Sequence, residues 1–259
     1  MRETQLVIFV VLCFDRLIFI TLLYELRGLV EKGQKMKRQP RLTKQSEEYL
    51  EAIYKLQERN GVAKTTEIAK QLNVALGSVT NTIECLERKG LIEHKPYKGV
   101  KLTEKGKREA LKVIRRHRLA ERLLVDILKM EWSQVHEAAC SLEHALNEEV
   151  LKHIERALRY PAKCPHGNPI PTSDGKIEEE PSYPLNMLEI GKHAEIVKLT
   201  EESREKLKIL EEYRIKPRRK LYLMDKNSEE GFLKVKIDGK SLELSSEIAA
   251  IIWVREINE

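Results

Sequence analysis

The sequence is poor in cysteine, and the few cysteines exclude two common classes of small domain. Its 259 residues contain 4 cysteines, and no two of them form a Cys-x-x-Cys pair. Neither a disulfide framework nor a zinc ribbon is therefore indicated. Irregularly spaced thiols fit a reducing compartment, so we expect the protein to be cytoplasmic.

The chain also lacks an unbroken apolar run long enough to cross a bilayer. Its most apolar stretch, residues 6–29, is divided by the charged pair Asp15 and Arg16. A membrane helix needs about 20 apolar residues, and charges at its centre are costly. No small-residue cleavage site follows, so a secretory signal is not indicated. Because the composition changes sharply at Met36, we expect the native polypeptide to begin there and residues 1–35 to be an upstream extension; a membrane anchor is the alternative.

Basic residues outnumber acidic ones in an otherwise ordinary globular composition. Apolar residues make up 41% and charged residues 34% of the chain, and the formal net charge is +6. The length allows two or three domains, each with a core of its own. The positive excess favours a polyanionic partner.

Residues 36–102 have the pattern of a winged helix-turn-helix. Apolar periodicity and then alternation predict three helices and two strands, in the order 47–58, 67–72, 76–89, 91–95 and 100–102. The third helix opens with small polar side chains, which can reach base edges or phosphates in the major groove of double-stranded DNA. The predicted DNA-binding residues are Gly77, Ser78, Thr80 and Asn81, with Lys98 on the wing. A face that contacts protein or only solvent is the alternative.

The remainder of the chain predicts two further units, so that the fold class is mainly α with a small β component. Residues 103–160 are expected to form a helical dimerisation domain, with helices over 103–130, 134–146 and 148–158. The next segment, 161–185, holds 6 of the 9 prolines and is predicted to be a linker. Beyond it, residues 186–259 are expected to form a small barrel, with strands over 194–199, 220–224, 232–237 and 249–254.

A second chemical feature lies on the helix predicted over 134–146. His136, Cys140, Glu143 and His144 recur there at i, i+4, i+7 and i+8, so that all four share one face. Imidazole, thiolate and carboxylate are good ligands for divalent transition metals. His117 and Glu121 form a further i, i+4 pair upstream. A polar surface is the alternative for a single histidine, but metal ligands behind a DNA reader indicate a regulator whose DNA affinity depends on metal.

Three motifs give the chain a resemblance to the diphtheria-toxin-repressor-like regulators, which depend on iron or manganese. They are Arg115-Arg-His117-Arg-Leu-Ala-Glu121-Arg-Leu-Leu, Val135-His136-Glu-Ala-Ala-Cys140-Ser-Leu-Glu143-His144 and Cys164-Pro-His-Gly-Asn-Pro-Ile-Pro171. The resemblance covers roughly residues 42–259. It implies an N-terminal winged helix, a dimerisation domain with two metal sites, and a C-terminal SH3-like (FeoA-like) domain.

The resemblance also assigns metal ligands, residue by residue. His117, Glu121 and His136 match the family's ancillary site, whereas Cys140, Glu143 and His144 match its primary site. On the first helix, Glu48 stands where iron-type repressors have methionine and manganese-type repressors have an acid, and Glu51 matches a manganese-type ligand. The chain therefore mixes iron-like Cys140 with manganese-like acids. The family also allows a ligand from the C-terminal domain, near Glu201 and Glu202.

The function expected from this reading is that of a homodimeric, Fe(II)-activated repressor of metal-uptake genes. Its partner would be a palindromic DNA operator, and neither a small-molecule substrate nor a membrane is expected. A thiolate ligand favours iron over manganese, while the added carboxylates leave Mn(II) as the alternative metal. A metalloenzyme is a second alternative, although no further catalytic constellation accompanies the ligands. A membrane-tethered sensor that uses residues 6–29 is the third.

Overall fold

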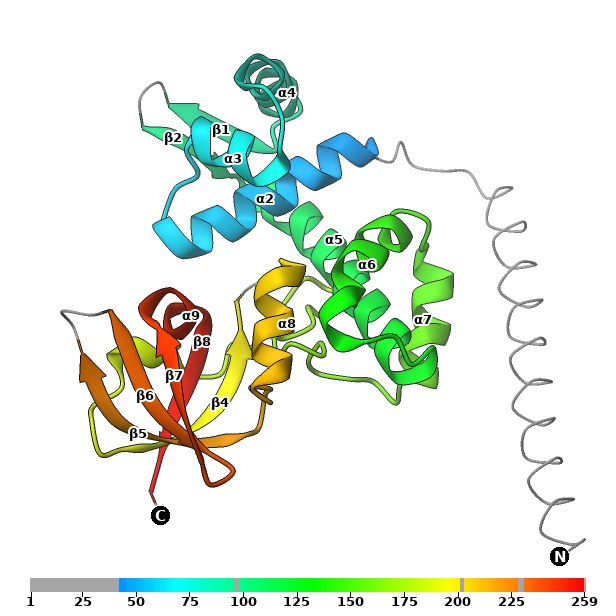
Figure 1. Cartoon of the computed structure of the whole chain (residues 1–259). Coiled ribbons are helices and arrows are strands. Elements are labelled where there is room, and N and C mark those ends of the chain that lie inside the picture. Colours follow the sequence, from blue (N-terminus) through cyan, green and yellow to red (C-terminus); the bar gives the residue numbers. More distant parts are fainter. Residues whose placement is uncertain (1–41, 96–97, 201–202, 228–230, 259) are drawn as a thin grey trace, which may run out of the picture.

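The computed structural model describes residues 42–95, 98–200, 203–227 and 231–258, which form three packed units (Figure 1). Met36, the apolar residues 6–29, Glu201 and Glu202 lie outside the described residues. None of the described helices combines the length and the apolar composition that a bilayer-spanning helix requires.

The first unit is the predicted winged helix. It consists of α2 (Lys44–Asn60), α3 (Thr65–Leu72), α4 (Leu76–Arg88), β1 (Ile92–Lys95) and β2 (Gly99–Leu102). The Thr43 side chain accepts a hydrogen bond from the Ser46 amide and caps α2, which ends at Gly61 in the left-handed conformation. The two strands pair antiparallel, with Ile92 opposite Leu102. The apolar faces of the helices and the hairpin share one core.

The second unit is helical and grows out of the first through one long helix. It contains α5 (Glu104–Arg122), the π-helical turn η1 (Leu123–Ile127), the short η2 (Trp132–Gln134), α6 (Val135–Glu143) and α7 (Glu148–Ala157). The first half of α5 packs into the winged-helix core and its second half into a separate helical core. A single rigid element therefore joins the DNA-reading unit to the second unit.

The helix predicted over 103–130 is shorter in the structure. The α-helical part of α5 ends at Arg122, and the chain continues as a π-helical turn. Lys129 then adopts a left-handed conformation with φ 57°, which ends the helical segment. The amphipathic pattern continued through these residues, but it does not distinguish an α-helix from a π-helical turn.

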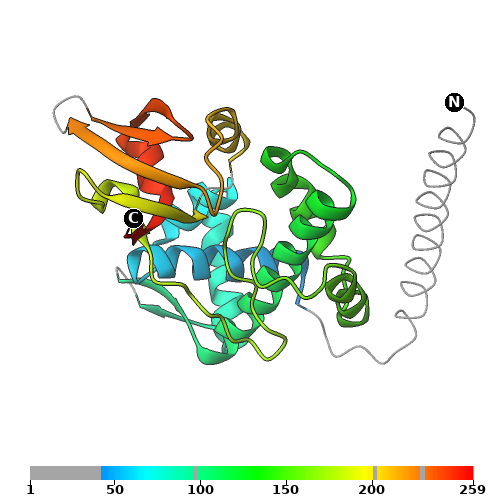
Figure 2. The same ribbon diagram turned by 90° about the horizontal axis from the view of Figure 1, so that it is seen from below.

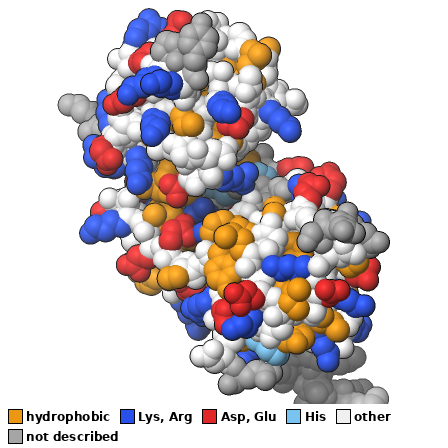
Figure 3. Space-filling model, turned by 90° about the vertical axis from the view of Figure 1, so that its left-hand side faces the viewer, with side chains coloured by type: hydrophobic (Ala, Val, Ile, Leu, Met, Phe, Trp, Pro, Cys, Tyr) orange, Lys and Arg blue, Asp and Glu red, His pale blue; other side chains and the backbone are white. Residues whose placement is uncertain are grey.

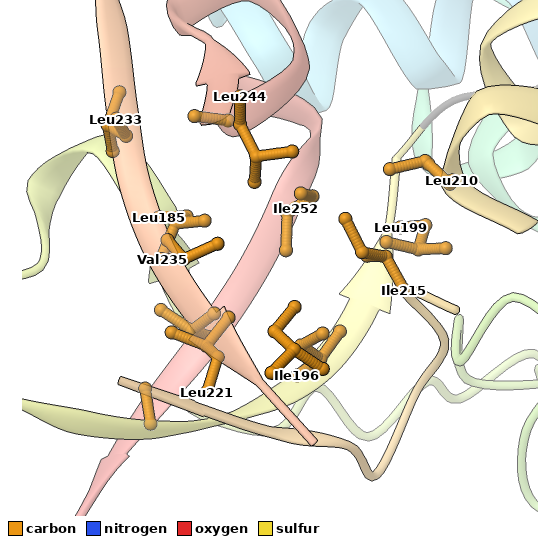
Figure 4. Packing of buried hydrophobic residues seen from close by; sticks show 14 of the residues in the cluster. Leu185, Ile196, Leu199, Leu210, Ile215, Leu221, Leu233, Val235, Leu244 and Ile252 are labelled. Carbon is orange, nitrogen blue, oxygen red and sulfur yellow. The ribbon is translucent and has the colours of Figure 1, made fainter. Parts of the chain in front are cut away.

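The third unit is a curled antiparallel sheet of six strands. In chain order these are β3 (Tyr183–Pro184), β4 (His193–Leu199), β5 (Lys220–Asn227), β6 (Phe232–Ile237), β7 (Lys240–Ser245) and β8 (Ile252–Ile257). Their order in the sheet is β3-β8-β4-β5-β6-β7. Apolar side chains from neighbouring strands, among them Ile196, Leu221, Val235 and Ile252, meet inside the curl (Figure 4). The predicted fold class, mainly α with a small β unit at the C-terminal end, is confirmed.

Two parts of the C-terminal prediction were wrong in detail. The strand predicted over 249–254 begins only at Ile252, because residues Ser246–Ile251 form helix α9. The Ser245 side chain accepts a hydrogen bond from the Ile248 amide and caps this helix, a local signal that outweighs the apolar run. Helix α8 (Arg204–Glu212), which packs beside η2, was not predicted.

The segment predicted to be a linker packs between the second and third units. Trp132 lies in the core of the third unit and donates a hydrogen bond from Nε1 to the Pro165 carbonyl at 3.0 Å. The Leu199 amide of β4 donates to the His166 carbonyl at 2.9 Å. The third unit therefore docks on the loop that carries Cys164 and His166, and the chain crosses there between the two units (Figure 2).

Candidate functional site

Helices α5 and α6 bring three of the predicted metal ligands together. The Cys140 Sγ atom lies 3.5 Å from His136 Nε2 and 3.9 Å from His117 Nδ1. One ligand atom from each residue lies within 4.8 Å of the others. His136 and Cys140 are one turn apart on α6, and the facing α5 contributes buried His117. We refer to His117, His136 and Cys140 as the helical cluster.

The environment of the helical cluster favours a thiolate beside charged imidazole. Burial raises the pKa of the Cys140 thiol, but hydrogen bonds with His117 and His136 outweigh burial and leave this pKa below its ordinary value. Burial lowers the pKa of His117, but the Glu121 carboxylate and hydrogen bonds with Cys140, Glu121 and Glu143 raise it well above the ordinary value. A divalent cation could bind the same sulfur and nitrogen atoms by displacing their protons.

Glu143 and His144 extend the helical cluster toward α2. Glu143 Oε2 lies 2.8 Å from His117 Nδ1, and Glu143 Oε1 lies 3.2 Å from His144 Nε2. Burial, together with repulsion from Glu51, raises the pKa of the Glu143 carboxyl although His117 opposes this. His117 therefore joins residues that the resemblance divides between an ancillary and a primary site.

The two predicted ligands of α2 lie in different surroundings. Glu48 Oε1 is 3.8 Å from His144 Nε2 and 3.7 Å from Lys44 Nζ, and the Glu48 side chain is 42% exposed. Glu51 is buried and forms a 2.8 Å ion pair with Lys55. The neighbouring Glu47, which was not predicted as a site residue, accepts a hydrogen bond from His144 Nδ1 at 2.8 Å.

The sequence analysis missed part of a second cluster of side chains that could hold a metal. Glu121, Cys164 and His166 are all buried, and one ligand atom from each lies within 4.8 Å of the others. His166 Nδ1 faces Glu121 Oε1 at 3.2 Å, and its Nε2 faces the Trp132 carbonyl at 3.3 Å. Because a carbonyl and a carboxylate both only accept, the protonated ring donates from both nitrogens, and Nδ1 would offer a lone pair to a metal once its proton has left. We refer to Glu121, Cys164 and His166 as the loop cluster; the Cys-Pro-His sequence was the signal that could have found it.

In the loop cluster, Glu121 and the neighbouring histidines stabilise each other's charged forms. Burial lowers the pKa of His166, but the Glu121 carboxylate outweighs it and raises this pKa to about 10. Burial raises the pKa of Glu121, but His166 and His117 together hold it well below its usual range. A cleft of about 800 Å³ between α2, α5 and the third unit is lined by residues of both clusters, including His117 and His166. The waist between the winged-helix lobe above and the C-terminal lobe below is visible in Figure 3.

The side chains fit a divalent metal by one geometric criterion. Among the described residues, the Nε2 atoms of His117 and His144 are buried and make no hydrogen bond of good geometry. Each nevertheless faces carboxylate oxygen: Glu121 lies 3.4 Å from the first, and Glu143 lies 3.2 Å from the second. Ring nitrogen and carboxylate oxygen atoms that converge without a well-formed hydrogen bond are an arrangement that a shared cation would satisfy.

The predicted DNA-reading residues form an exposed face on α4 and the wing. Gly77, Ser78, Thr80, Asn81 and Lys98 are all exposed. The Thr80 hydroxyl donates back to the carbonyl of its own helix at Leu76, so it is less available to a ligand than Ser78 or Asn81. Lysine and arginine side chains are frequent on the winged-helix lobe in Figure 3.

Comparison with known families and proteins matches the three units in the same order. The descriptions that match are "Iron dependent repressor, N-terminal DNA binding domain" over 41–100, "Iron dependent repressor, metal binding and dimerisation domain" over 103–172, and "FeoA domain" over 183–256. The iron-dependent repressor IdeR of Mycobacterium tuberculosis is 40% identical over 126 residues, which cover 49% of this chain and 55% of that protein. The chain thus spans about half the length of this relative.

Two other matches cover nearly the whole of the protein compared. An uncharacterized HTH-type transcriptional regulator of Methanocaldococcus jannaschii is 43% identical over 110 residues, which cover 42% of this chain and 88% of that protein. The solved structure of a manganese-dependent transcriptional repressor in complex with manganese superposes with a TM-score of 0.76 at 30% identity, covering 82% of this chain and 100% of that one. The matched families are repressor domains, which confirms the prediction that the chain is not an enzyme. The chain belongs to the diphtheria-toxin-repressor-like, iron-dependent repressor family and carries its DNA-binding, dimerisation and FeoA domains.

Proposed function

We propose that the protein is a metal-dependent repressor that binds palindromic operator DNA as a homodimer, uses Fe(II) as its activating metal, and controls genes for metal uptake. The matched DNA-binding and dimerisation domains support the first part. The names of the relatives include both iron- and manganese-dependent repressors, so the choice of metal rests on the ligands of this chain.

The observation that carries the proposal is that the DNA-reading unit and the metal-ligand helix meet at one histidine. His144 caps the end of α6, and its two ring nitrogens face Glu47 at 2.8 Å and Glu48 at 3.8 Å, both on α2. A ligand set that includes Glu48 beside Cys140, Glu143 and His144 would therefore draw on both units. When bound, a divalent cation supplies positive charge that these acceptor groups share.

Metal binding to this proposed ligand set would change the affinity for DNA through helix α2. Glu48 lies on α2, which contacts the DNA-reading helix α4, and the two helices pack into one core. Fixing α2 against α6 therefore fixes α4 relative to the dimerisation unit. Such a coupling typically amounts to about 1–3 kcal/mol per site and is reciprocal between metal and DNA.

A dimer would place two reading helices at one fixed separation. Ile127 and Leu128, at the end of the helical segment that follows α5, are 40% and 42% exposed, which supports an apolar partner surface on the second unit. A two-fold axis between the copies predicts a palindromic operator with half-sites about 34–36 Å apart or a multiple of this spacing.

The preference for iron follows from the position of the thiol. The Cys140 sulfur points toward both imidazoles of the helical cluster, which supports a ligand role for the thiolate. Thiolate and imidazole favour Fe(II) over Mn(II), and the general affinity order places iron above manganese as well. Glu48 and Glu51 add hard oxygen atoms, so Mn(II) is the runner-up.

The function is tested by operator binding in controlled metal. A palindromic operator selected from random-sequence DNA is titrated with the protein in Fe(II), Mn(II), Co(II), Ni(II) or Zn(II), and in a chelator. We expect tight binding with metal and weak binding with chelator. Equal affinity in both states would overturn the mechanism.

The metal preference is tested by replacing the thiol with a carboxylate. Wild type is expected to bind operator at a lower free concentration of Fe(II) than of Mn(II), and Cys140→Glu is expected to shift the preference toward Mn(II). His153→Ala, at an exposed position on α7, is the control. If wild type responds first to manganese and Cys140→Glu changes nothing, the iron preference is wrong.

A further inference from the structure

Glu47 holds three helices together at the edge of the ligand set. Its Oε2 accepts a hydrogen bond from His144 Nδ1 at 2.8 Å, and its Oε1 forms a 2.8 Å ion pair with Arg116 Nη2. The side chains of Glu47, Arg116 and His144 are only 14%, 10% and 12% exposed. These three residues come from α2, α5 and the end of α6, so one carboxylate contacts all the helices that surround the proposed ligands.

This carboxylate decides which nitrogen of His144 carries the proton. Glu47 forms an ion pair with the Arg116 guanidinium, and a carboxylate in such a pair can only accept hydrogen bonds. The neutral His144 ring must then carry its proton on Nδ1, which leaves a lone pair on Nε2. That atom is buried without a good hydrogen bond and faces Glu143 at 3.2 Å and Glu48 at 3.8 Å.

We propose that Glu47 is a positioning residue that orients His144 and fixes its tautomer for metal binding, so that α2 prepares the site before any ligand of α2 engages. The inference rests on the proposed metal-dependent function. A carboxylate that accepts the second N–H of a ligating imidazole sets the ring orientation and raises its basicity, and loss of such a partner typically costs about 10- to 100-fold in metal affinity.

A purely structural salt bridge is the competing explanation, and the chain offers a matched control for it. Arg115, beside Arg116 on α5, forms a 2.8 Å ion pair with Glu155 of α7, and the two side chains are 6% and 21% exposed. Glu155→Ala would therefore break a comparably buried ion pair in which, among the described residues, neither side chain is hydrogen-bonded to a proposed ligand.

The test measures the tautomer of His144 in metal-free protein and the affinity for Co(II). Nitrogen-15 NMR of the full chain, at a pH where the ring is neutral, is expected to show the proton of His144 on Nδ1. Glu47→Ala should lose this tautomer and bind Co(II) about 10- to 100-fold more weakly. Glu47→Gln keeps an acceptor oxygen, so it should retain the tautomer and recover much of the affinity. Glu155→Ala should change neither quantity.

The outcomes separate this inference from the proposed function. A proton on Nε2 in wild type, an unchanged Glu47→Ala, or an equal loss in Glu155→Ala would each overturn the positioning role. If the tautomer and Co(II) affinity behave as expected but Co(II) leaves operator affinity unchanged, the proposed function fails while the role of Glu47 stands. If Glu47→Ala does not fold, the tautomer of the wild-type protein still decides the matter, because a proton on Nε2 would exclude the positioning role.

Discussion

The helical and loop clusters contain similar ligands but face different neighbours. The helical cluster of His117, His136 and Cys140 lies between α5 and α6 and continues through Glu143 and His144 to α2. The loop cluster of Glu121, Cys164 and His166 lies where α5 meets the loop on which the third unit docks. His117 and Glu121, one turn apart on α5, connect the two.

The structural element next to each cluster determines which property of the protein metal binding would change. Ordering the helical cluster restrains α2, and with it the reading helix, so its effect should appear in DNA affinity. Ordering the loop cluster restrains the loop that carries Cys164 and His166. In this loop the His166 carbonyl accepts from the Leu199 amide of β4, and the Asn168 side chain donates to the Leu199 carbonyl, so the effect should appear in the docking of the third unit. Two chemically similar sites would therefore have different consequences.

The largest expected difference lies in operator affinity. At saturating Fe(II), Cys140→Ala should weaken operator binding by about 5- to 150-fold, the range of a typical coupling, because a ligand next to the α2 contact is lost. Cys164→Ala should weaken it much less. Fluorescence anisotropy with labelled operator measures both, with His153→Ala as the control. A larger loss in Cys164→Ala would reverse the roles assigned to the clusters.

The second prediction concerns stability. Here Cys164→Ala should have the larger effect and Cys140→Ala the smaller one. With free metal at about 100 times its Kd, binding to the loop cluster stabilises the docked state by about 2.7 kcal/mol. Metal should therefore slow hydrogen exchange of the Leu199 amide, which donates to His166. Cys164→Ala should abolish this protection, and Cys140→Ala should retain it. Equal protection in wild type and Cys164→Ala would show that metal at the loop cluster does not stabilise the docking of the third unit.

The smallest expected effects lie on the DNA-reading face, far from either cluster. Asn81→Ala should relax the sequence preference at one base position by about 1 kcal/mol, the usual worth of one hydrogen bond. Lys98→Ala should instead weaken all sequences alike and reduce the slope of log affinity against log salt by about 1. Selection from random DNA and a salt titration distinguish the two, and neither variant should alter metal affinity. An unchanged sequence profile for Asn81→Ala would exclude it as a base reader.

The sequence predicted those parts of the site that depend on local periodicity. His136 and Cys140 share a face because four residues complete about one helical turn, and this holds wherever the helix packs. The winged helix was predicted for the same reason. The boundary of α5 and the presence of α9 were missed because they depend on a π-helical turn and on a cap at Ser245, which the apolar pattern does not distinguish.

The sequence could not show which residues meet across elements. Cys164 and His166 stand on a proline-rich loop, where spacing carries no facial periodicity, and only packing brings them to Glu121. Glu47 and Glu48 are adjacent acids on α2, and the rotation of α2 against α6 decides which of them contacts His144 at hydrogen-bond distance. That rotation is set by the shared core, which involves residues from the whole winged helix.

The most direct test of the coupling between the helical cluster and DNA is its reciprocity. The affinity of the protein for Co(II) is measured with and without saturating operator, beside the affinity for operator with and without Co(II). We expect the two factors to be equal within error, about 5- to 150-fold, and Cys140→Ala to remove both. A Co(II) affinity that does not change when operator is added would contradict this expectation.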